Sequence, residues 1–529
     1  MTSLVTAKDL KAWLHDGAEI ALFDVREHGQ YGEAHLFYAV PLPFSRLEID
    51  APRLAPRRTA RVVVYDGDGT VAFEAAERLE ALGYTDVYVL RDGASGWTRA
   101  GYTLFAGVNV RSKAFGELVE AAFHTPRVTA RELAAMRDSG ADVVIVDGRP
   151  VNEYLKMTIP SSICCPNGEL GYRIRELVPN PDTPIVVNCA GRTRSIIGAQ
   201  TLINLGISNP VMALENGTQG WFLEDFELEH GSTRRYPDAV TPSAVEDMRH
   251  ASHQLAERFT VPDIDRATLA RWVDEGTHSL FLCDVRTPEE FAKGSLPGAQ
   301  HTPGGQLIQA TDQYVGVRHA RLVLFDADGV RAAIVASWLR LMGHDAYVLR
   351  DGIASGASVP VPAAAVLPAL SSVSAEALVD ALAAGTAQVV DLRPSMAYRC
   401  AHVPGSTWAI RSRPPVFAAG LDIVLVADDD RIAELAAADW RRHAPYSNAR
   451  IMRLAGGFAA WTAAGRPVEA TPELPPDSEC IDYLFFVHDR HDGNKAAARQ
   501  YLAWETGLLA QLDAEELAGF KIGAHTATL

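Results

Sequence analysis

A cysteine stands where an apolar run gives way to a short loop with one glycine and two arginines. Cys189 ends the run 186–188, and a helix-forming segment begins at Ser195. A thiol between the end of a strand and the start of a helix is surrounded by backbone N–H groups and by the positive end of the helix dipole. Such surroundings lower a cysteine pKa from about 8.5 into roughly the 3.5–7.5 range. The pattern therefore predicts that Cys189 is a nucleophile, charged at neutral pH.

The residues after Cys189 are suited to binding an anion. Their backbone N–H groups can hold an anionic sulfur and the charge that develops as it reacts. Two guanidinium groups add charge-assisted donors, and we expect Arg194 to close the loop and Arg192 to face its mouth. The predicted binding residues are Ala190, Gly191, Arg192, Thr193, Arg194 and Ser195.

The segment around Cys189 is one of four copies. Each copy has an Asp-x-Arg motif and, downstream, a second apolar run that ends at a loop residue. Three copies place that loop residue 42 positions after the aspartate of the motif, and the fourth places it 37 positions after. The pairs are Asp24 with Asp66, Asp147 with Cys189, Asp284 with Asp326, and Asp391 with Asp428. The cysteine is thus expected in the second copy alone, with aspartate in the other three.

The elements that position these loops follow the same order in each copy. A capped helix comes first, and its expected cap is Thr6, Thr129, Asp265 or Ser374. Short strands that are apolar throughout then alternate with helices, which predicts parallel sheets covered on both faces. In such sheets ligands bind at the carboxyl ends of the strands, where Cys189 is expected. The predicted fold class is α/β.

The chain divides where Pro, Gly and Ser collect. We expect four domains and a tail, with Val359–Leu370 as a linker. The tail combines an aromatic, strand-like patch at Tyr483–Val487 with a docking helix from about Lys495 to Leu512. The expected ranges are 1–108, 109–235, 236–360, 366–470 and, for the tail, 471–529.

Composition narrows the class of protein. The formal net charge of −17 over 529 residues argues against nucleic acid or an anionic membrane as the main partner. No apolar run approaches the roughly 18 residues of a membrane helix, and no basic, then apolar N-terminus marks a signal peptide. Six cysteines in so long a chain do not form a disulfide framework. We therefore expect a cytoplasmic protein.

At this point the residues resemble the rhodanese family of sulfurtransferases. The resemblance covers residues 1–470 in four tandem copies, and the segment 189–195, Cys-Ala-Gly-Arg-Thr-Arg-Ser, is similar to a rhodanese active-site loop. Upstream, the second copy keeps the family's Glu-aromatic and Ile-Pro pairs as Glu153-Tyr154 and Ile159-Pro160. It departs from the family's Gly, His, Gly and Ala at Met157, Thr158, Ser161 and Ser162.

The resemblance implies a fold and a reaction. Each copy would be a small domain with a central, mainly parallel sheet flanked by helices, and the first, third and fourth would be inactive. Cys189 would take a sulfane sulfur from thiosulfate or a related persulfide donor and pass it to a thiol or cyanide, a protein acceptor included. Covalent catalysis by a thiolate agrees with this two-step transfer. Asp147 and Arg149 are expected to form an internal ion pair that braces the loop.

Two other groups of residues are predicted to have structural rather than chemical roles. Cys164 and Cys165 could reduce a persulfide on Cys189, but two buried small residues are the favoured interpretation. The histidines and aspartates at 488–492 resemble a metal cluster by composition, yet they lack an i, i+4 histidine pair. We predict no metal and no cofactor.

Two rival functions remain open. A cysteine phosphatase or an arsenate reductase would use the same kind of loop, but phosphatases place five residues between Cys and Arg, and here four separate Cys189 from Arg194. The shorter loop encloses a smaller space, which favours a single sulfur atom over a phosphate group. A scaffold or sulfur carrier without turnover would also explain three copies that lack the nucleophile.

Overall fold

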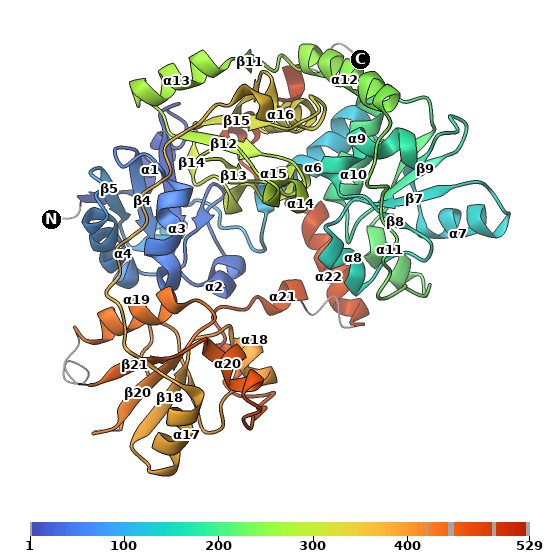
Figure 1. The fold of residues 1–529 in the computed structure, drawn as a ribbon. Coiled ribbons are helices and arrows are strands. Elements are labelled where there is room, and N and C mark those ends of the chain that lie inside the picture. The colour runs from blue at the N-terminus through green and yellow to red at the C-terminus, as the bar shows by residue number, and fades with distance from the viewer. Residues whose placement is uncertain (1–2, 419, 443–448, 489–492, 525–529) are drawn as a thin grey trace.

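The computed structural model describes residues 3–418, 420–442, 449–488 and 493–524 (Figure 1). Within these residues the strands form four sheets, one for each predicted copy, and we call the copies the first to fourth units. The family resemblance's α/β fold with sheets flanked by helices is confirmed. No helix in this described part of the chain is long and apolar enough to cross a membrane.

The second unit is a parallel sheet of five strands. In spatial order these are β6 (Arg127–Val128), β10 (Val211–Leu214), β9 (Ile185–Asn188), β7 (Val144–Asp147) and β8 (Ile163–Cys164). Its helices are α7 (Ala130–Asp138), α8 (Val151–Lys156), α9 (Asn167–Leu177), α10 (Thr193–Asn204) and α11 (Gly217–Leu223). Strand β9 is buried along its whole length, as expected for a central strand covered on both faces.

The first and third units share a sheet edge. The first has β1 (Ser3–Val5), β5 (Val87–Leu90), β4 (Arg61–Tyr65), β2 (Ile20–Asp24) and β3 (Val40–Pro41). The third has β11 (Asp263–Ile264), β16 (Asp345–Leu349), β15 (Arg321–Phe325), β12 (Leu280–Asp284) and β13 (Gln300–His301). A short strand of the third unit, β14 (Val317–Arg318), pairs antiparallel with β2 and extends the first sheet. This strand pairing between the two units was not predicted.

The fourth unit repeats the strand order of the second. Its strands are β17 (Ser372–Val373), β21 (Ile451–Leu454), β20 (Asp422–Val426), β18 (Ala387–Asp391) and β19 (Thr407–Trp408). Its helices are α17 (Ala375–Ala383), α18 (Ser395–Cys400), α19 (Asp430–Trp440) and α20 (Gly457–Ala463). The expected linker, residues 359–370, has no helix or strand.

The four predicted caps are confirmed. The side chains of Thr6, Thr129, Asp265 and Ser374 each accept a hydrogen bond from the backbone N–H three residues on. They begin α1 (Ala7–Trp13), α7, α13 (Arg266–Glu275) and α17. The remaining helices of the first unit are α2 (His28–Glu33), α3 (Leu47–Leu54), α4 (Thr70–Ala81) and α5 (Gly93–Arg99), and those of the third are α14 (Pro288–Ala292), α15 (Gly304–Gln309) and α16 (Arg331–Leu341).

Two connecting helices were not predicted. Helix α6 (Val110–Phe123) joins the first unit to the second, and α12 (Pro242–Arg258) joins the second to the third. Helix α6 packs against α10, and α12 packs against α16. One apolar core runs through the first three units, because Phe23, Phe115, Ile197 and Trp338 belong to the same buried cluster. These three units therefore cannot be separated without exposing apolar surface.

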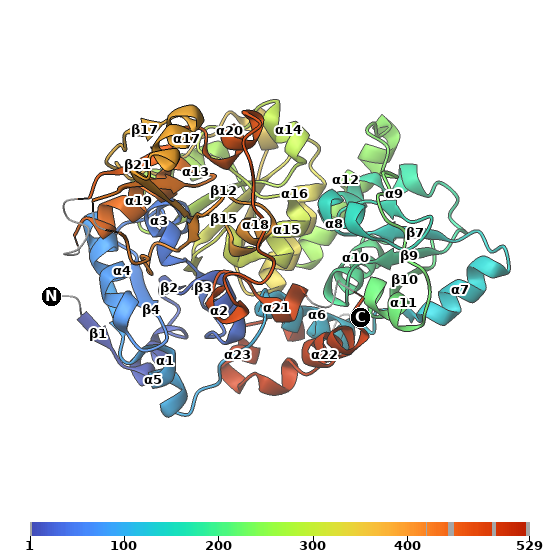
Figure 2. The same cartoon turned by 90° about the horizontal axis from the view of Figure 1, so that it is seen from below.

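The tail returns from the fourth unit to the others (Figure 2). Its helices are α21 (Phe485–His488), α22 (Lys495–Thr506) and α23 (Ala514–Ala518). The strand expected at Tyr483–Val487 is wrong, since a helical turn stands there. The predicted docking helix is present as α22, which packs against α6 and α11. The aromatic residues of 483–487 belong to a docked segment with a helical turn and not to a strand at a sheet edge.

Candidate active site

Strand β9 places Cys189 at the carboxyl edge of the second sheet. Asn188 lies opposite Asp147 in the parallel register, so Cys189 is the first residue beyond the strand. The cysteine is 2% exposed, and the hydroxyl of Ser195 donates a hydrogen bond to its sulfur at 3.1 Å. Ser195 lies in the first turn of α10, which begins at Thr193. The thiol therefore stands at a helix N-terminus, as the sequence predicted.

A glycine turn holds the loop from the other side. The carbonyl oxygen of Cys189 accepts a hydrogen bond from the N–H of Thr218 at 2.8 Å, and the Ala190 carbonyl accepts from the N–H of Gln219 at 3.2 Å. Both donors belong to the first turn of α11. Gly217 has a φ of 54°, and a Cβ there would lie 2.3 Å from the Cys189 carbonyl oxygen. This close approach explains why a glycine stands at position 217.

The two loop arginines have different surroundings. Arg194 forms a two-pronged ion pair with Glu153 of α8, at 2.8 and 2.7 Å. Burial opposes its charge, but the Glu153 carboxylate outweighs burial and raises the pKa of Arg194. The guanidinium also interacts electrostatically with Cys189. Arg194 is thus a permanent cation beside the sulfur.

Arg192 does not face the mouth of the loop as expected. Its side chain is 7% exposed and binds both oxygens of Glu117 on α6, at 2.7 and 2.9 Å. Glu120, one turn further along α6, contacts the same guanidinium. Because α6 was not foreseen as a helix, its carboxylates could not be matched with Arg192. The arginine anchors the loop to α6.

Asp147 and Arg149 brace the strand end. The Arg149 guanidinium donates to both carboxylate oxygens of Asp147, at 2.9 and 2.7 Å, and both residues are buried. Asp147 also accepts hydrogen bonds from Asn188 at 2.9 Å and from Thr158 at 2.8 Å. The same fork recurs in the other units as Asp24 with Arg26, Asp284 with Arg286 and Asp391 with Arg393. The pair is an internal clamp that ties Asn188, and so the start of the loop, to the neighbouring strand.

The loops of the first and third units enclose a carboxylate. Asp66 accepts backbone hydrogen bonds from Val71 at 2.6 Å and Ala72 at 3.0 Å. Asp326 accepts from Gly329 at 2.8 Å, Val330 at 3.1 Å and Ala332 at 2.8 Å. Both aspartates follow a residue that lies opposite the aspartate of the Asp-x-Arg motif, as Cys189 does. In these units the loop N–H groups are directed at an anion that the chain itself supplies.

The fourth unit requires a correction. Val426 lies opposite Asp391, so the position of Cys189 is taken by Ala427 and not by Asp428. A Cβ on Gly457 would lie 2.4 Å from the Ala427 carbonyl oxygen, which repeats the contact between Gly217 and Cys189. The alanine was misread as the last residue of the strand because it continues the apolar run. The fourth unit therefore has neither a thiol nor a carboxylate at this position.

The loop that follows Cys189 opens into a cavity of about 530 Å³. Its lining includes Cys189 and the predicted residues Ala190 to Arg194, but also side chains that the sequence analysis missed. Gln306 and Gln309 come from the third unit, and Lys113 comes from α6. The tail contributes Tyr501 and Glu505, and Glu505 accepts a hydrogen bond from Thr193 at 2.8 Å. The buried Glu505, 2% exposed, is thus part of the loop's surroundings.

The two cysteines nearest in sequence to the Cys189 loop are unsuited to nucleophilic work. Burial raises the pKa of Cys164 to about 12 and raises that of Cys165 well above its usual value. Both are buried, as the favoured interpretation proposed. Of the histidines and aspartates considered as a metal cluster, His488 belongs to α21 and lines the cavity, and residues 489–492 lie outside the described part of the chain.

Comparisons with known proteins agree with this geometry. A model of the rhodanese-like domain matches residues 6–100, 129–224 and 265–358. A solved thiosulfate sulfurtransferase from Pseudomonas aeruginosa is 42% identical, with a TM-score of 0.92, over 98% of this chain and 99% of that chain. The chain belongs to the rhodanese family. Its matched rhodanese units are the first three, and the fourth has their strand order without the match.

A smaller structure resembles a single rhodanese unit. A protein of unknown function from Rhodopseudomonas palustris, described as a possible tyrosine phosphatase, is 32% identical over 21% of this chain and 90% of its own, with a TM-score of 0.19. No curated protein matches the chain.

Proposed function

We propose that Cys189 carries sulfane sulfur from thiosulfate, or a related persulfide donor, to a thiol or cyanide. The chain belongs to the rhodanese family, and 98% of it is covered by the match to a solved thiosulfate sulfurtransferase, so it is an enzyme of the sulfurtransferase type. The observation that supports Cys189 is internal to the chain. The first and third loops direct backbone N–H groups at the carboxylates of Asp66 and Asp326, and the second loop has a thiol at the same register position.

The N–H groups that would hold the sulfur follow from that register. Most of the backbone donors to Asp66 and Asp326 lie three to six residues after the aspartate. The same positions after Cys189 are Arg192, Thr193, Arg194 and Ser195. A persulfide bears its charge on the outer sulfur, and backbone N–H groups at a helix N-terminus stabilise such an anion. The guanidinium of Arg194 adds a fixed positive charge.

The reaction then has two displacements. The Cys189 thiolate attacks the outer sulfur of thiosulfate, the S–S bond of the donor breaks with its electron pair, and sulfite leaves. A thiolate or cyanide next attacks the outer sulfur of the Cys189 persulfide, and the Cys189 thiolate leaves. The products are a new persulfide or thiocyanate, and no external oxidant or reductant is consumed. Ser195, at 3.1 Å, donates a hydrogen bond to the departing thiolate.

The size of the cavity bears on the acceptor. A volume of about 530 Å³ falls in the range of pockets for ligands of roughly 300–1,000 Å³. Cyanide or one thiosulfate would leave most of it empty. This space favours an acceptor thiol that is attached to a larger group, either a small molecule or the end of a protein segment. A thiol that works as a thiolate also requires a reducing compartment such as the cytoplasm.

Mass spectrometry after thiosulfate treatment tests the proposal. The wild-type chain is expected to gain one sulfur atom on the Cys189 peptide, and Cys189→Ser is expected to gain none and to lose turnover. A variant with alanine in place of Cys164, Cys165, Cys283, Cys400 and Cys480 serves as the control and should keep both. Sulfur found on another cysteine would overturn the assignment. Loading without turnover would instead identify a carrier.

A phosphate ester and arsenate, assayed beside thiosulfate, separate the remaining rival. A rate with either that exceeds the thiosulfate rate would favour the phosphatase or arsenate reductase reading. Four residues between Cys189 and Arg194 lead us to expect the opposite result.

A further inference from the structure

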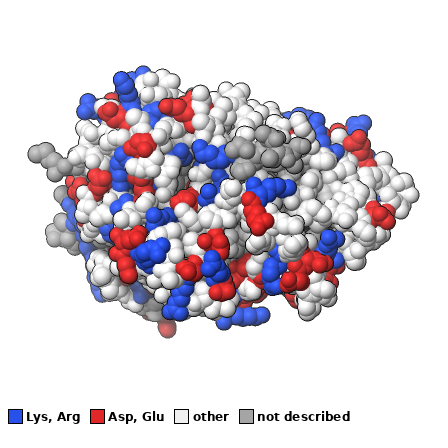
Figure 3. All heavy atoms as spheres, turned by 90° about the horizontal axis from the view of Figure 1, so that it is seen from above, with Lys and Arg blue, Asp and Glu red and all other residues white. Residues whose placement is uncertain are grey.

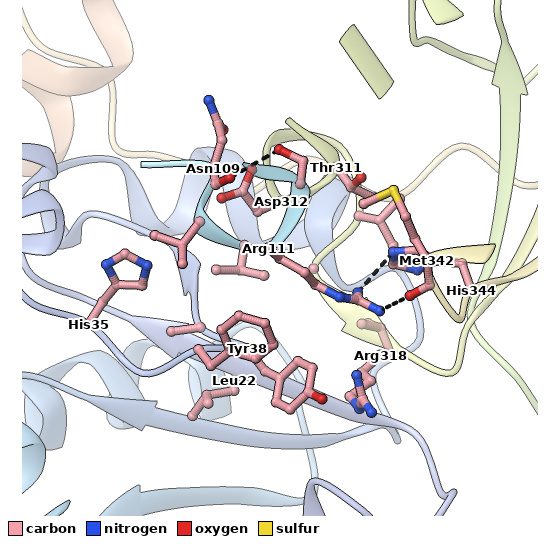
Figure 4. A pocket seen from close by; sticks show the side chains of 18 of the residues that line it. Leu22, His35, Tyr38, Asn109, Arg111, Thr311, Asp312, Arg318, Met342 and His344 are labelled. Carbon is pink, nitrogen blue, oxygen red and sulfur yellow. Dashed lines mark hydrogen bonds between the residues drawn. The ribbon is translucent and has the colours of Figure 1, made fainter. Parts of the chain in front are cut away.

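A second cavity lies between the first unit, the third unit and the start of α6 (Figure 4). Its volume is about 60 Å³, and one buried water needs roughly 10–15 Å³ by the same measure. A few waters or one small oxyanion would fill it. Leu22 lies on one side, and Arg111, Arg318 and His344 lie near one another on another side.

The two arginines come from different parts of the chain. Arg111 is the second residue of α6, and Arg318 ends β14, the strand that the third unit adds to the first sheet. The carbon of the Arg318 guanidinium lies 3.8 Å from the centre of the Tyr38 ring, and that of Arg111 lies 5.6 Å from it. The pair therefore concentrates positive charge around one aromatic ring.

Neutral groups are the hydrogen-bond partners of these cations. Arg111 donates to Nε2 of His344 at 2.9 Å and to the Met342 carbonyl oxygen. Arg318 donates to the Leu14 carbonyl oxygen at 3.0 Å. Within the described residues, neither guanidinium has a carboxylate oxygen within 4.0 Å. Both arginines are partly buried, and removing a cation from water without a counter-ion is costly.

Other titratable groups surround the cations. Burial and the two arginines lower the pKa of His344, and burial with the same arginines lowers that of His319 to about 4. Both rings are therefore neutral near pH 7. One carboxylate, Asp312, also lines the cavity, beside Asn109 and Thr311. The Tyr31 hydroxyl donates a hydrogen bond to it at 3.5 Å, and burial raises the pKa of Asp312 to about 6.

The start of α6 adds a second source of positive potential. Asn109, Val110, Arg111 and Ser112 all line the cavity, so the first turn of a helix of 14 residues opens into it. The first N–H groups of a helix have no partner within the helix, and its dipole favours an anion there. The Tyr38 hydroxyl, buried and without a hydrogen-bond partner in the described structure, is a further available donor.

We propose that this cavity binds one small inorganic oxyanion, of the sulfate or sulfite class, between Arg111, Arg318 and the first turn of α6. The anion would supply the missing counter-charge and join α6 to β14. Helix α6 also carries Glu117, which holds Arg192 of the catalytic loop. The anion site would therefore stabilise the helix on which the loop is anchored, although it lies outside the catalytic cavity.

Titration calorimetry with sulfate tests the site in the full chain. Sulfate has no sulfane sulfur, so its binding does not depend on the proposed transfer reaction. Arg318→Met is expected to weaken sulfate binding at least tenfold, and Arg318→Lys, which keeps the charge, is expected to weaken it less. Arg99→Met removes an exposed arginine that pairs with Asp92 and should leave the affinity unchanged. Equal affinities for wild type and Arg318→Met would overturn the proposal.

A crystal soaked in selenate, the heavier analogue of sulfate, locates the ion directly. An anomalous peak between the guanidinium groups of Arg111 and Arg318 is expected in the wild type and should be absent from Arg318→Met. If Arg318→Met is less stable than the wild type, the electron density of its crystals still shows whether the surrounding fold is kept. Ordered water in the wild-type cavity, with no anomalous peak, would overturn the proposal.

Discussion

One position distinguishes the second unit, which we propose to be catalytic, from the other three units. Cys189, Asp66, Asp326 and Ala427 occupy the same place beyond the end of a central strand. A carboxylate there satisfies the loop N–H groups but cannot carry sulfane sulfur, and alanine can do neither. The strand register is common to the four units, and in the proposed function the side chain at this position decides the chemistry.

Restoring the thiol in the third unit is expected not to create a second site. In Asp326→Cys the loop still contains Asp328, which accepts hydrogen bonds from the N–H of Val330 and from Arg331, both at 2.9 Å. That carboxylate would repel an anionic donor. The sulfur content of the variant after thiosulfate treatment should stay at one per chain. Two sulfur atoms per chain would show that the third loop still accepts an anion.

The Arg194 charge is expected to matter for the transition state. Arg194→Ala removes a charge-assisted interaction with Glu153 and the positive charge near the sulfur. The loss should be about 1.5–3 kcal/mol, or roughly 10- to 150-fold in kcat/KM. Arg194→Lys keeps the charge, so it is the control and should lose less. An unchanged kcat/KM in Arg194→Ala would contradict this role.

At the scale of elements, two helix starts hold the catalytic loop. Helix α10 presents its first turn to Cys189, and α11 binds the carbonyl oxygens of Cys189 and Ala190 from the opposite side. The glycine that begins α11 allows this contact because it has no side chain. These contacts pack the loop closely from both sides.

Gly217→Ala is expected to damage the loop more than the fold. Its positive φ alone costs about 1–2 kcal/mol for alanine, and the new Cβ would also push on the Cys189 carbonyl oxygen at 2.3 Å. Gly206→Ala is the matched control, because Gly206 has a φ of 69° with open space around it. Both variants should lose thermal stability, but only Gly217→Ala should lose most of its thiosulfate turnover. Equal activity in the two variants would contradict the proposed contact.

The Glu27 carboxylate is expected to make stability depend on pH. It begins α2, accepts hydrogen bonds from the N–H of Ser45 at 3.2 Å and its hydroxyl at 2.9 Å, and is 4% exposed. Burial raises its pKa from 4.5 to about 7. An acid with a raised folded pKa contributes stability below its unfolded pKa, and that contribution is lost as pH rises through 7.

Denaturation of Glu27→Gln against wild type measures this contribution. Between pH 4.5 and 8 the wild type should lose about 3 kcal/mol relative to the variant, which follows from the pKa difference. The neutral amide keeps the size of the side chain, so packing changes little. Parallel stability curves over this pH range would contradict the prediction.

The whole molecule is a core of three units with a fourth docked on it by charge. The first three share one apolar cluster, and the apolar clusters of the fourth unit are its own. Arg411 joins the fourth unit to the first, where it binds Glu48 at 2.5 and 2.7 Å and the Phe44 carbonyl oxygen at 3.0 Å. The tail then crosses back, and Lys11 of the first unit pairs with Glu516 near its end.

Charge on the surface is mixed. On the face drawn in Figure 3, described lysines and arginines are interspersed with aspartates and glutamates. The ion pairs that join the units are buried and are therefore distinct from the charges on this exposed face.

Arg411→Met is expected to loosen the fourth unit. Removing one partner of a fully buried ion pair costs about 3–5 kcal/mol. Arg78 remains beside Glu48 and Asp439 when Arg411 is removed, so a smaller loss is expected here. Limited proteolysis should then cut the linker at 359–370 faster than in the wild type. Arg431→Met, an exposed arginine on α19 that pairs with Asp429, should leave the rate unchanged. Equal cleavage of all three proteins would show that the pair does not hold the unit.

Local signals predicted the repeating elements well. The caps at Thr6, Thr129, Asp265 and Ser374 and the strand end at Cys189 all depend on residues close in sequence. The same method failed at Ala427 and at Tyr483–Val487, because an alanine extends an apolar run and an aromatic patch suits a strand as well as a docked turn. Local pattern identifies an element and places its ends less well.

The sequence by itself determined the fourfold repeat, the α/β class and the place of Cys189 at a strand end, because these follow from periodicity and spacing within one unit. Only the tertiary structure decided what surrounds that cysteine. Glu117 comes to Arg192 from a connecting helix, Gln309 comes from another unit, and Glu505 comes from the tail more than 300 residues away. Contacts between units depend on how finished surfaces fit together, and no spacing along the chain records that fit.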